Sequence, residues 1–162
     1  MFGNRMKINQ GQVPWTDEES PKKKFGVLRK ALTLAVGGRK DIGVFGGGHP
    51  FDVELTKLPP DKANWPLHEH TAQWEAFIVV SGRGILRTKE AQREIVPGDF
   101  IVNPPGEAHQ IINRGQEDLV YYVIADNPPS DIVYYPDSKK WTMKPPRKVY
   151  ELHEVDYYKD EE

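Results

Sequence analysis

Short apolar segments separated by turn residues make up most of the chain. Runs rich in Val, Ile, Tyr, Phe and Trp alternate with turns drawn from 14 glycines and 14 prolines. This spacing is typical of many short strands joined by tight connections. The pattern therefore predicts an all-β protein, with strands near 26–36, 42–48, 51–58, 65–70, 74–81, 84–89, 92–96, 100–103, 108–113, 119–125 and 132–135.

Two segments are ambiguous in this pattern. The apolar positions of KKKFGVLRKALTLAVGG, residues 22–38, fit a helix and also an extended strand at the edge of a barrel. The stretch GVFGGGHP, residues 43–50, is rich in glycine but lacks the Gly-Lys-Ser/Thr ending of a phosphate-binding loop. A turn or bulge is therefore favoured there over a nucleotide site.

The length of 162 residues is sufficient for one domain with a real core. Polarity divides the chain into three parts. We expect an N-terminal arm at 1–24, a single β-barrel domain at 25–143 and an acidic C-terminal tail at 144–162.

Charge and composition remove several classes of function. A net charge of -2 gives no electrostatic reason to expect nucleic acid or an anionic membrane as partner. The absence of cysteine excludes disulfides and thiolate metal sites, so any metal would need imidazole and carboxylate ligands. The chain shows neither an apolar signal segment near its start nor an apolar run of about eighteen residues, which predicts a cytoplasmic location and no membrane span.

Three histidines and a glutamate stand out as candidate ligands. His68 and His70 lie two residues apart, so on a strand both side chains face the same side while Glu69 turns away. A turn through residues 71–74 would bring the carboxylate of Glu75 beside them. His109, after a Pro-Pro-Gly turn, offers a third imidazole.

This donor set suits Mn, Fe, Co, Ni, Cu or Zn. Four protein ligands on a six-coordinate ion leave two positions for water, substrate or dioxygen. The alternative is a set of packed core histidines with a salt-bridged glutamate, although four converging polar groups are costly to bury without a metal.

The spacing of these residues resembles the cupin superfamily. Its first motif, His-x-His-x4-Glu-x6-Gly, and its second, Gly-x5-Pro-x-Gly-x2-His-x3-Asn, are matched at every fixed position, within a core of residues 50–125, by His68, His70, Glu75, Gly82, Gly98, Pro104, Gly106, His109 and Asn113. The longer pattern is similar to small single-domain metal-binding cupins of the cupin_2 type. The resemblance implies an RmlC-like jelly roll, or double-stranded β-helix, holding one divalent metal at His68, His70, Glu75 and His109.

Residues flanking the ligands are candidates for a substrate pocket. Phe77, Val79 and Ile111 would form an apolar wall around the metal, Trp65 and Gln110 would lie at the rim, and Tyr121 and Tyr122 would reach the pocket from the next strand. For each of these residues ordinary core packing remains the alternative. His49 and His153 lie outside both motifs, and we expect them to be solvated.

Two classes of function remain open. One is a metal-dependent enzyme that isomerises, decarboxylates or dioxygenates a small carboxylate, hydroxy-keto compound or sugar. The other is a non-catalytic binding or sensing cupin. No catalytic residue can be assigned, because the sequence supplies no unambiguous second acid or base. Arg83 and Arg87 alternate with inward-facing small and apolar residues, which argues against a phosphorylated substrate.

The segment WEAFIVV predicts an assembly. If Glu75 faces the cavity, the outer row is wholly apolar and needs a cover: Trp74, Ala76, Ile78 and Val80. We expect a homodimer, with the N-terminal segment 25–36 of the same chain as the alternative cover. The expected partners are thus a small-molecule ligand and a second copy of the chain, without nucleic acid or membrane.

Overall fold

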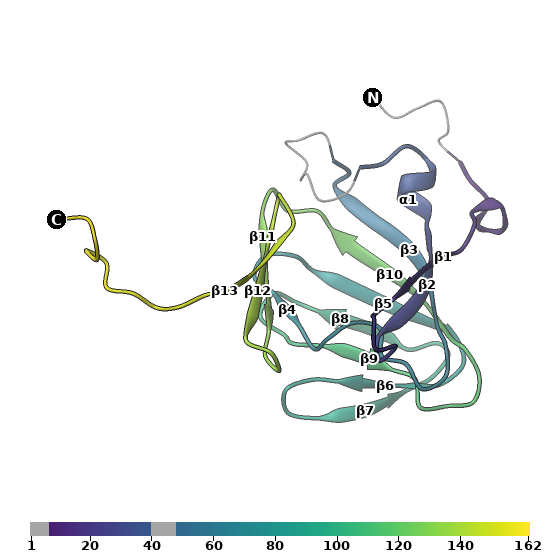
Figure 1. The fold of residues 1–162 in the computed structure, drawn as a ribbon. Helices are drawn as coiled ribbons and strands as arrows, with labels where there is room; N and C mark the ends of the chain where they lie inside the picture. Colours follow the sequence, from purple (N-terminus) through teal and green to yellow (C-terminus); the bar gives the residue numbers. More distant parts are fainter. Residues whose placement is uncertain (1–6, 40–47) are drawn as a thin grey trace.

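Antiparallel strands form nearly all the regular structure of the computed structural model, which describes residues 7–39 and 48–162 (Figure 1). The only helical turns in this part of the chain are short. The elements are η1 Gln10–Gln12, β1 Thr16–Glu19, β2 Gly26–Ala31, α1 Leu32–Ala35, β3 Phe51–Leu58, β4 Glu69–His70, β5 Glu75–Ser81, β6 Gly84–Arg87, β7 Gln92–Ile95, β8 Phe100–Asn103, β9 Gln110–Ile112, β10 Leu119–Asp126, β11 Asp131–Tyr135, β12 Lys140–Lys144 and β13 Lys148–Glu151.

The strands build three sheets that wrap around one interior. The largest has the order β1-β2-β3-β10-β5-β8, and the others have the orders β13-β12-β11-β4 and β7-β6-β9. In Figure 1 the β11–β13 strands stand at the left, β1 and β2 at the right, and β6 and β7 at the bottom. This non-sequential antiparallel order is that of a jelly roll, so the predicted fold class is confirmed.

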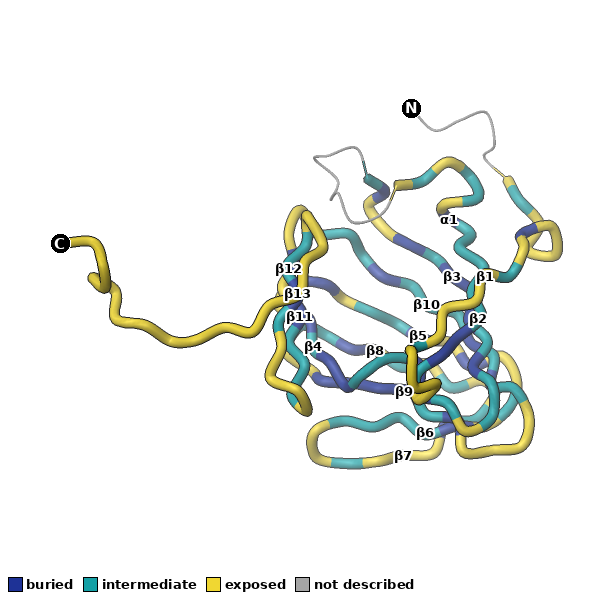
Figure 2. The backbone as a smooth tube through the Cα atoms, viewed as in Figure 1, coloured by how far each residue is buried: buried dark blue, intermediate teal, exposed yellow. Residues whose placement is uncertain are grey.

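The core lies between these sheets, where strand alternation points one side chain in two inward. Eight buried side chains meet there: Val27, Leu58, Phe77, Val79, Ile95, Ile111, Leu119 and Tyr121. In Figure 2 buried and less buried residues follow one another along the strands, whereas the C-terminal segment is exposed throughout. The interior near the β6–β7 sheet is thus apolar, and the polar part of the interior lies elsewhere, at the site described below.

Both ends of the chain contribute strands that the sequence did not predict. Strand β1 lies within the expected N-terminal arm and pairs with β2. Strand β13 lies within the expected acidic tail and pairs with β12. All four residues of each strand are exposed, so neither has the apolar alternation by which a strand is recognised. The division of the chain at residues 24 and 144 stays a prediction.

The ambiguous segment 22–38 contains both structures that its pattern allowed. It forms strand β2, and then a single helical turn, α1. The strand expected at 42–48 falls on residues that, apart from residue 48, lie outside the described part of the chain. Among the described residues, no helix is long and apolar enough to span a membrane.

The outer face of β5 and β8 carries exposed apolar side chains. Trp74 is 52% exposed and Phe100 65% exposed, and Ile78, Val80 and Val102 are exposed beside them. Strands β1 and β2 extend the sheet edge to edge from β3, at the opposite side from β8. Within the described residues the N-terminal strands therefore do not provide the intrachain cover that the sequence left open.

His49 was expected to be solvated, and this prediction is wrong. The residue is only 5% exposed. A Cβ atom added to Gly38 would lie 2.1 Å from His49 Cε1, so the imidazole occupies the space that a side chain at position 38 would need. His153 is exposed in the C-terminal segment, as expected.

Candidate metal centre

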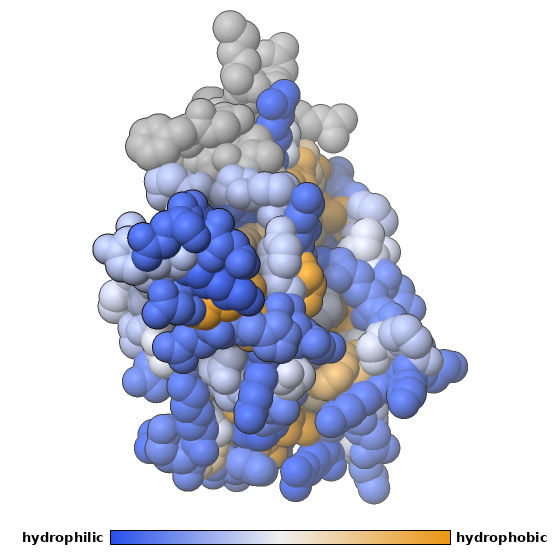
Figure 3. Space-filling model, turned by 60° about the vertical axis from the view of Figure 1, so that its left-hand side comes forward, coloured by the Kyte–Doolittle hydropathy of each residue, from blue (hydrophilic) through white to orange (hydrophobic). Residues whose placement is uncertain are grey.

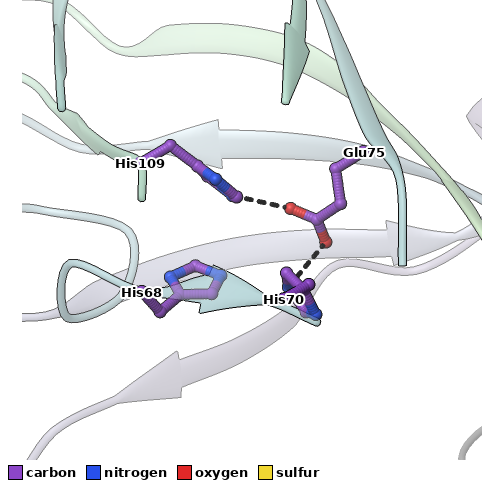
Figure 4. Close-up of side chains that lie close together, drawn as sticks. All are labelled: His68, His70, Glu75 and His109. Carbon is purple, nitrogen blue, oxygen red and sulfur yellow. Dashed lines mark hydrogen bonds and ion pairs between the residues drawn. The ribbon is translucent and has the colours of Figure 1, made fainter. Parts of the chain in front are cut away.

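Four side chains converge inside the barrel, beside the β4 strand. His68 and His70 lie just before and at the end of β4, Glu75 begins β5, and His109 immediately precedes β9. One ligand atom from each residue lies within 4.8 Å of one from every other. Figure 4 shows the carboxylate of Glu75 reaching between His109 and His70, with His68 alongside. The structure thus brings together all four residues that the sequence singled out.

Backbone pairing and one tight turn align these residues. The amide of His109 donates to the carbonyl of His68 at 2.9 Å, so the two histidines sit opposite one another. Gly106 has φ +85°, a left-handed conformation that suits glycine. Its amide donates to the carbonyl of His70 at 2.8 Å and ties the turn before His109 to β4. The glycine of the second motif therefore shapes the site.

Gly82, at the end of the first motif, is required for a different reason. It also has positive φ, at +78°, and an added Cβ would lie 2.3 Å from the carbonyl oxygen of Asp118. Asn113, at the end of the second motif, bonds the carbonyls of Leu58 and Glu117 with its side-chain amide. These two motif positions stabilise the barrel rather than reaching the cluster.

Each of the three imidazoles uses its Nδ1 atom for an anchoring contact. His68 Nδ1 lies 2.9 Å from the carbonyl oxygen of Pro66, and His109 Nδ1 lies 3.0 Å from that of Glu107. Because a carbonyl can only accept, both Nδ1 atoms carry the proton in these contacts. In the neutral rings Nε2 then holds a lone pair, which is the form that binds metals.

The contacts inside the cluster fit a bound cation. His109 Nε2 lies 2.9 Å from Glu75 Oε2, where a neutral imidazole would set one lone pair against another. His70 Nε2 is buried without a hydrogen-bond partner in the described residues, 3.8 Å from Glu75 Oε1. A positive charge among these atoms would satisfy both, and three imidazoles with one carboxylate suit a divalent transition metal. The residues therefore fit the metal expected from the sequence.

Burial and close charges shift the acid–base properties of the cluster. Burial, followed by the neighbouring His109 imidazole, lowers the pKa of His68 to about 3. For Glu75 burial alone would raise the pKa, but the close contact with His109 and the electrostatic effect of the surrounding imidazoles outweigh it and hold the pKa well below its usual range. Above mildly acidic pH, His68 is thus neutral and Glu75 ionised, as ligation requires.

These shifts predict that the metal-free protein loses stability in acid. The unfolded chain protonates His68 near its ordinary pKa of 6.5, whereas the folded protein resists until about 3. The stabilisation is therefore complete above pH 6.5 and is lost as the pH falls towards 3. The lowered pKa of Glu75 acts in the same direction at the lower end of this range. Thermal unfolding of metal-free protein should show a midpoint that falls between neutral pH and about pH 4, with a smaller fall in His68→Gln. An equal fall of the unfolding midpoint with pH in the wild type and in His68→Gln would contradict the role of His68 in this acid sensitivity.

Asp131, on β11, anchors the third imidazole. Its Oδ2 atom lies 2.6 Å from His70 Nδ1 and 3.3 Å from Lys144 Nζ, and its Oδ1 accepts from the amides of Ala72 and Gln73. Burial alone would raise its pKa, but the hydrogen bond with His70 and the charge of Lys144 hold that pKa below the usual range. A buried, ionised carboxylate behind a ligand imidazole fixes the orientation of the ring and raises its basicity.

Asp131→Asn is expected to weaken metal binding by roughly 10- to 100-fold, the usual cost of removing such a partner. An asparagine can keep the oxygen that caps Ala72 and Gln73 while replacing the carboxylate that faces His70. Competition of the apo-protein with a chromogenic chelator would measure the affinity. Asp137→Asn is the matched control, because this exposed aspartate pairs with Arg87 and touches no ligand. Wild-type affinity in Asp131→Asn would contradict the anchoring role.

A cavity of about 490 Å³ opens in front of the cluster. Of the residues expected to form a pocket, Trp65, Phe77 and Tyr121 line it. Among the described residues, the other four lie outside its lining. Val79 and Ile111 are buried in the apolar core, Gln110 binds the carbonyl of Trp65 with its side chain, and Tyr122 faces the opposite side of the sheet, where its hydroxyl bonds Gln10.

Strand β3 supplies cavity residues that the sequence reading missed. Asp52, Glu54 and Thr56 are all buried and line the cavity. Arg29 of β2 lies beside them, with its Nη1 atom 3.0 Å from Glu54 Oε2. The signal was present in FDVELTKL, residues 51–58, where three polar residues share one parity. Such a row of polar residues is usually expected to face solvent, but in this sheet that face of β3 lines the cavity and is buried.

Cationic residues also line the cavity. The sequence had argued against a phosphorylated substrate, because Arg83 and Arg87 alternate with small and apolar residues that were expected to face inward. Those two arginines pair with Glu94 and Asp137 and do not line it, as predicted. The basic groups come from strands that the sequence did not connect with the site, and the lining includes Arg29, Lys140, Lys144 and Arg147. The absence of inward charge on β6 therefore no longer argues against an anionic ligand.

Comparison with known proteins agrees with the fold and the cluster. Residues 54–125 match the family model described as the cupin domain. Auxin-binding protein 1 of Arabidopsis thaliana is 34% identical over 87 residues, covering 48% of this chain and 42% of that protein. The oxalate-binding protein of Thermotoga maritima is 31% identical over 68 residues, covering 42% of this chain and 55% of that one. The chain spans about half the length of these curated relatives.

Solved structures match a larger share of the chain. A candidate sugar phosphate isomerase from Acidithiobacillus ferrooxidans is 26% identical with a TM-score of 0.76, covering 90% of this chain and 92% of that one. A sugar phosphate isomerase of the cupin superfamily from Silicibacter pomeroyi is 24% identical with a TM-score of 0.70, covering 85% of each chain, and this likeness supports the fold alone. With a jelly roll, both histidine motifs and a domain model matched over residues 54–125, the chain is a small protein with a cupin domain.

Proposed function

We propose that this protein is a metal-dependent isomerase of a small polyhydroxylated carbonyl compound. One observation carries the proposal: His68, His70 and Glu75 of the four-residue cluster line the same cavity as a separate buried carboxylate, Glu54. The sequence supplied no unambiguous second acid or base, so it favoured an enzyme over a binding protein without deciding between them. Glu54 fills that role.

Position and contacts suit Glu54 to carry a proton. Its strand, β3, is separated from β5, which bears Glu75, only by β10, so the two backbones lie roughly 10 Å apart. A small molecule held at the cluster would span that gap. The hydrogen bond from Arg29 fixes the carboxylate in place. A bound divalent metal would act as a Lewis acid that polarises a carbonyl and its neighbouring hydroxyl.

The proposed reaction needs no co-reactant. Glu54 takes the proton from the hydroxyl-bearing carbon beside the carbonyl and returns it to the former carbonyl carbon, while a second proton passes between the two oxygens. The carbonyl and the hydroxyl thereby exchange places, and atoms and electrons balance. The sequence also allowed decarboxylation and dioxygenation, but neither reaction uses the transfer of a proton between two carbons that Glu54 is proposed to perform. The likeness to the Acidithiobacillus protein over 90% of the chain supports the same choice.

Exchange of protons with the solvent tests this function. Metal-loaded protein would be incubated in D2O with a panel of aldoses, ketoses and their phosphates, and products followed by NMR and mass spectrometry. We expect isomer formation with deuterium at the carbon beside the carbonyl for at least one member. Tight binding of panel members without exchange or isomerisation would contradict the isomerase.

That contrary outcome would favour the second candidate, a non-catalytic binding protein. The names of the two curated relatives, an auxin-binding and an oxalate-binding protein, favour this candidate. In that case the cavity would retain a ligand at the same cluster, and Glu54 would serve only to contact it. The cytoplasmic location expected from the sequence also stays a prediction.

We further propose that the protein is a homodimer formed through the outer face of β5 and β8. Ile78 and Phe100 lie opposite one another there. Light scattering should give twice the 18.5 kDa chain mass at micromolar concentration, and the pair Ile78→Lys and Phe100→Lys should give the single-chain mass. Val149→Lys, an exposed apolar site on β13, is the control. A wild-type monomer would contradict the dimer.

A further inference from the structure

The cavity has walls of opposite electrical character. On the side of β1, β2 and β3 its lining contains three carboxylates and one guanidinium: Glu18, Asp52, Glu54 and Arg29. On the side of β12 and the turn after it, the charged lining residues are Lys140, Lys144 and Arg147. In Figure 1 these two groups of strands stand on opposite sides of the molecule. The metal cluster lies towards the basic side, because Asp131 contacts both His70 and Lys144.

The acidic wall contains two polar atoms that could form hydrogen bonds with a ligand. Arg29 Nε and Thr56 Oγ1 are buried and have no hydrogen-bond partner within residues 7–39 and 48–162. Their residues are directly paired across β2 and β3, so both groups face one spot in the cavity, and Thr56 is only 3% exposed. Leaving such atoms unsatisfied is costly, which indicates that ligand or water completes them.

The chemistry of this spot selects a neutral group. The guanidinium of Arg29 already contacts Glu18 and Glu54, so its charge is balanced. The Nε–H group of Arg29, which lacks a partner among the described residues, and the Thr56 hydroxyl can bind an uncharged oxygen. The side chain of Trp65, over which Arg29 packs at 5.4 Å, closes the wall. A phosphate or carboxylate placed here would meet the surplus negative charge of Glu18, Asp52 and Glu54.

The basic wall has the opposite preference. Lys144 is held by Asp131 and Gln73, whereas neither Lys140 nor Arg147 forms an ion pair with any described residue. Figure 3, which brings this side of the molecule forward, shows hydrophilic side chains gathered over it, with hydrophobic ones visible between them. Two cations that have no ion-pair partner within the described part of the chain, at the edge of a cavity, favour an anionic group there.

We infer that the cavity binds its ligand in one direction, with hydroxyl groups at Arg29 and Thr56 and an anionic group at Lys140 and Arg147. The inference rests on the proposed function and narrows its substrate to polyhydroxylated anions, either sugar phosphates or sugar acids. Such a molecule lies across the metal cluster, with its reacting carbons between the two walls. Both ends of the ligand therefore contribute to its position relative to Glu54.

Calorimetry with matched ligands tests the orientation. Metal-loaded protein would be titrated with free monosaccharides, their phosphates and the corresponding sugar acids. We expect at least one class of anion to bind about tenfold more tightly than the matching neutral sugar, as one or two charge-assisted contacts would give. The class that shows this gain identifies the anionic group. The gain should shrink as sodium chloride is raised.

Paired variants locate the two ends. Lys140→Gln with Arg147→Gln should remove the preference for the anion, whereas Lys139→Gln with Lys148→Gln should keep it, since those exposed neighbours do not line the cavity. Thr56→Val should weaken neutral and anionic sugars alike, by roughly three- to tenfold.

Metal content measured on the same samples separates the possible failures. Full metal loading and equal binding of neutral and anionic sugars would overturn the orientation but leave the proposed function standing. An anion preference that survives in the Lys140 and Arg147 variant would also overturn it. Absence of both metal and sugar binding would overturn the proposed function itself.

Discussion

Glu54→Gln is expected to reduce the rate of isomerisation by about 100-fold or more, within the range that a positioned acid or base contributes. The amide keeps the size of the side chain and can still contact Arg29, but it cannot take up a proton. Metal content and sugar affinity should remain close to those of the wild type. This combination, a low kcat with an intact site, distinguishes proton transfer from a structural role.

The assay for this variant is the deuterium exchange described above, with Glu94→Gln as control. Glu94 is an exposed glutamate that pairs with Arg83 on the β6–β7 hairpin, far from the cavity lining. Exchange at the wild-type rate in Glu54→Gln would refute its role as proton carrier. Loss of sugar binding together with loss of rate would instead assign Glu54 to recognition.

Replacing His70 and His109 together by alanine is expected to abolish stoichiometric metal binding. Two of the three imidazoles are lost, and the remaining ligands, His68 and Glu75, make a weak pair. We expect an affinity more than about 100-fold lower, beyond the cost of losing one outer partner such as Asp131. Binding would be measured by elemental analysis after dialysis against buffered zinc or manganese.

His153→Ala is the control for this experiment, because that histidine lies in the exposed C-terminal segment. The metal-free double variant should remain folded. The two substitutions remove buried polar imidazoles, whose burial without a cation costs free energy. Circular dichroism would establish this. A folded double variant that still binds one metal per chain would place the metal elsewhere.

The ligand cluster was predictable from strand parity together with the resemblance to the two cupin motifs. Strand parity places His68 beside His70, and the spacing of the two motifs brings in Glu75 and His109. The fold class followed from the short apolar runs between glycines and prolines. Alternation along the chain suffices for the fold class and for the pair His68 and His70, whereas His109, 34 residues beyond Glu75, was found only through the second motif.

The rest of the site depends on contacts between distant segments. Asp131 reaches His70 only because β11 pairs with β4, a register that no local pattern specifies. From the sequence alone Glu54 and Thr56 would be expected to face solvent, whereas in the barrel their face of β3 lines the cavity. Tyr121 and Tyr122 were both candidates because parity alone does not say which face is inner. The cations of β12 entered the cavity from a segment whose strand was not expected at all.

Anomalous X-ray diffraction on crystals of the protein purified without chelator tests the central claim most directly. We expect one ion per chain, bonded at about 2.0–2.2 Å by Nε2 atoms of His68, His70 and His109 and by a carboxylate oxygen of Glu75. The absorption edge would also identify the metal. An anomalous peak at any other group of residues, or a cluster that stays without an ion after soaking in zinc and manganese, would contradict the account.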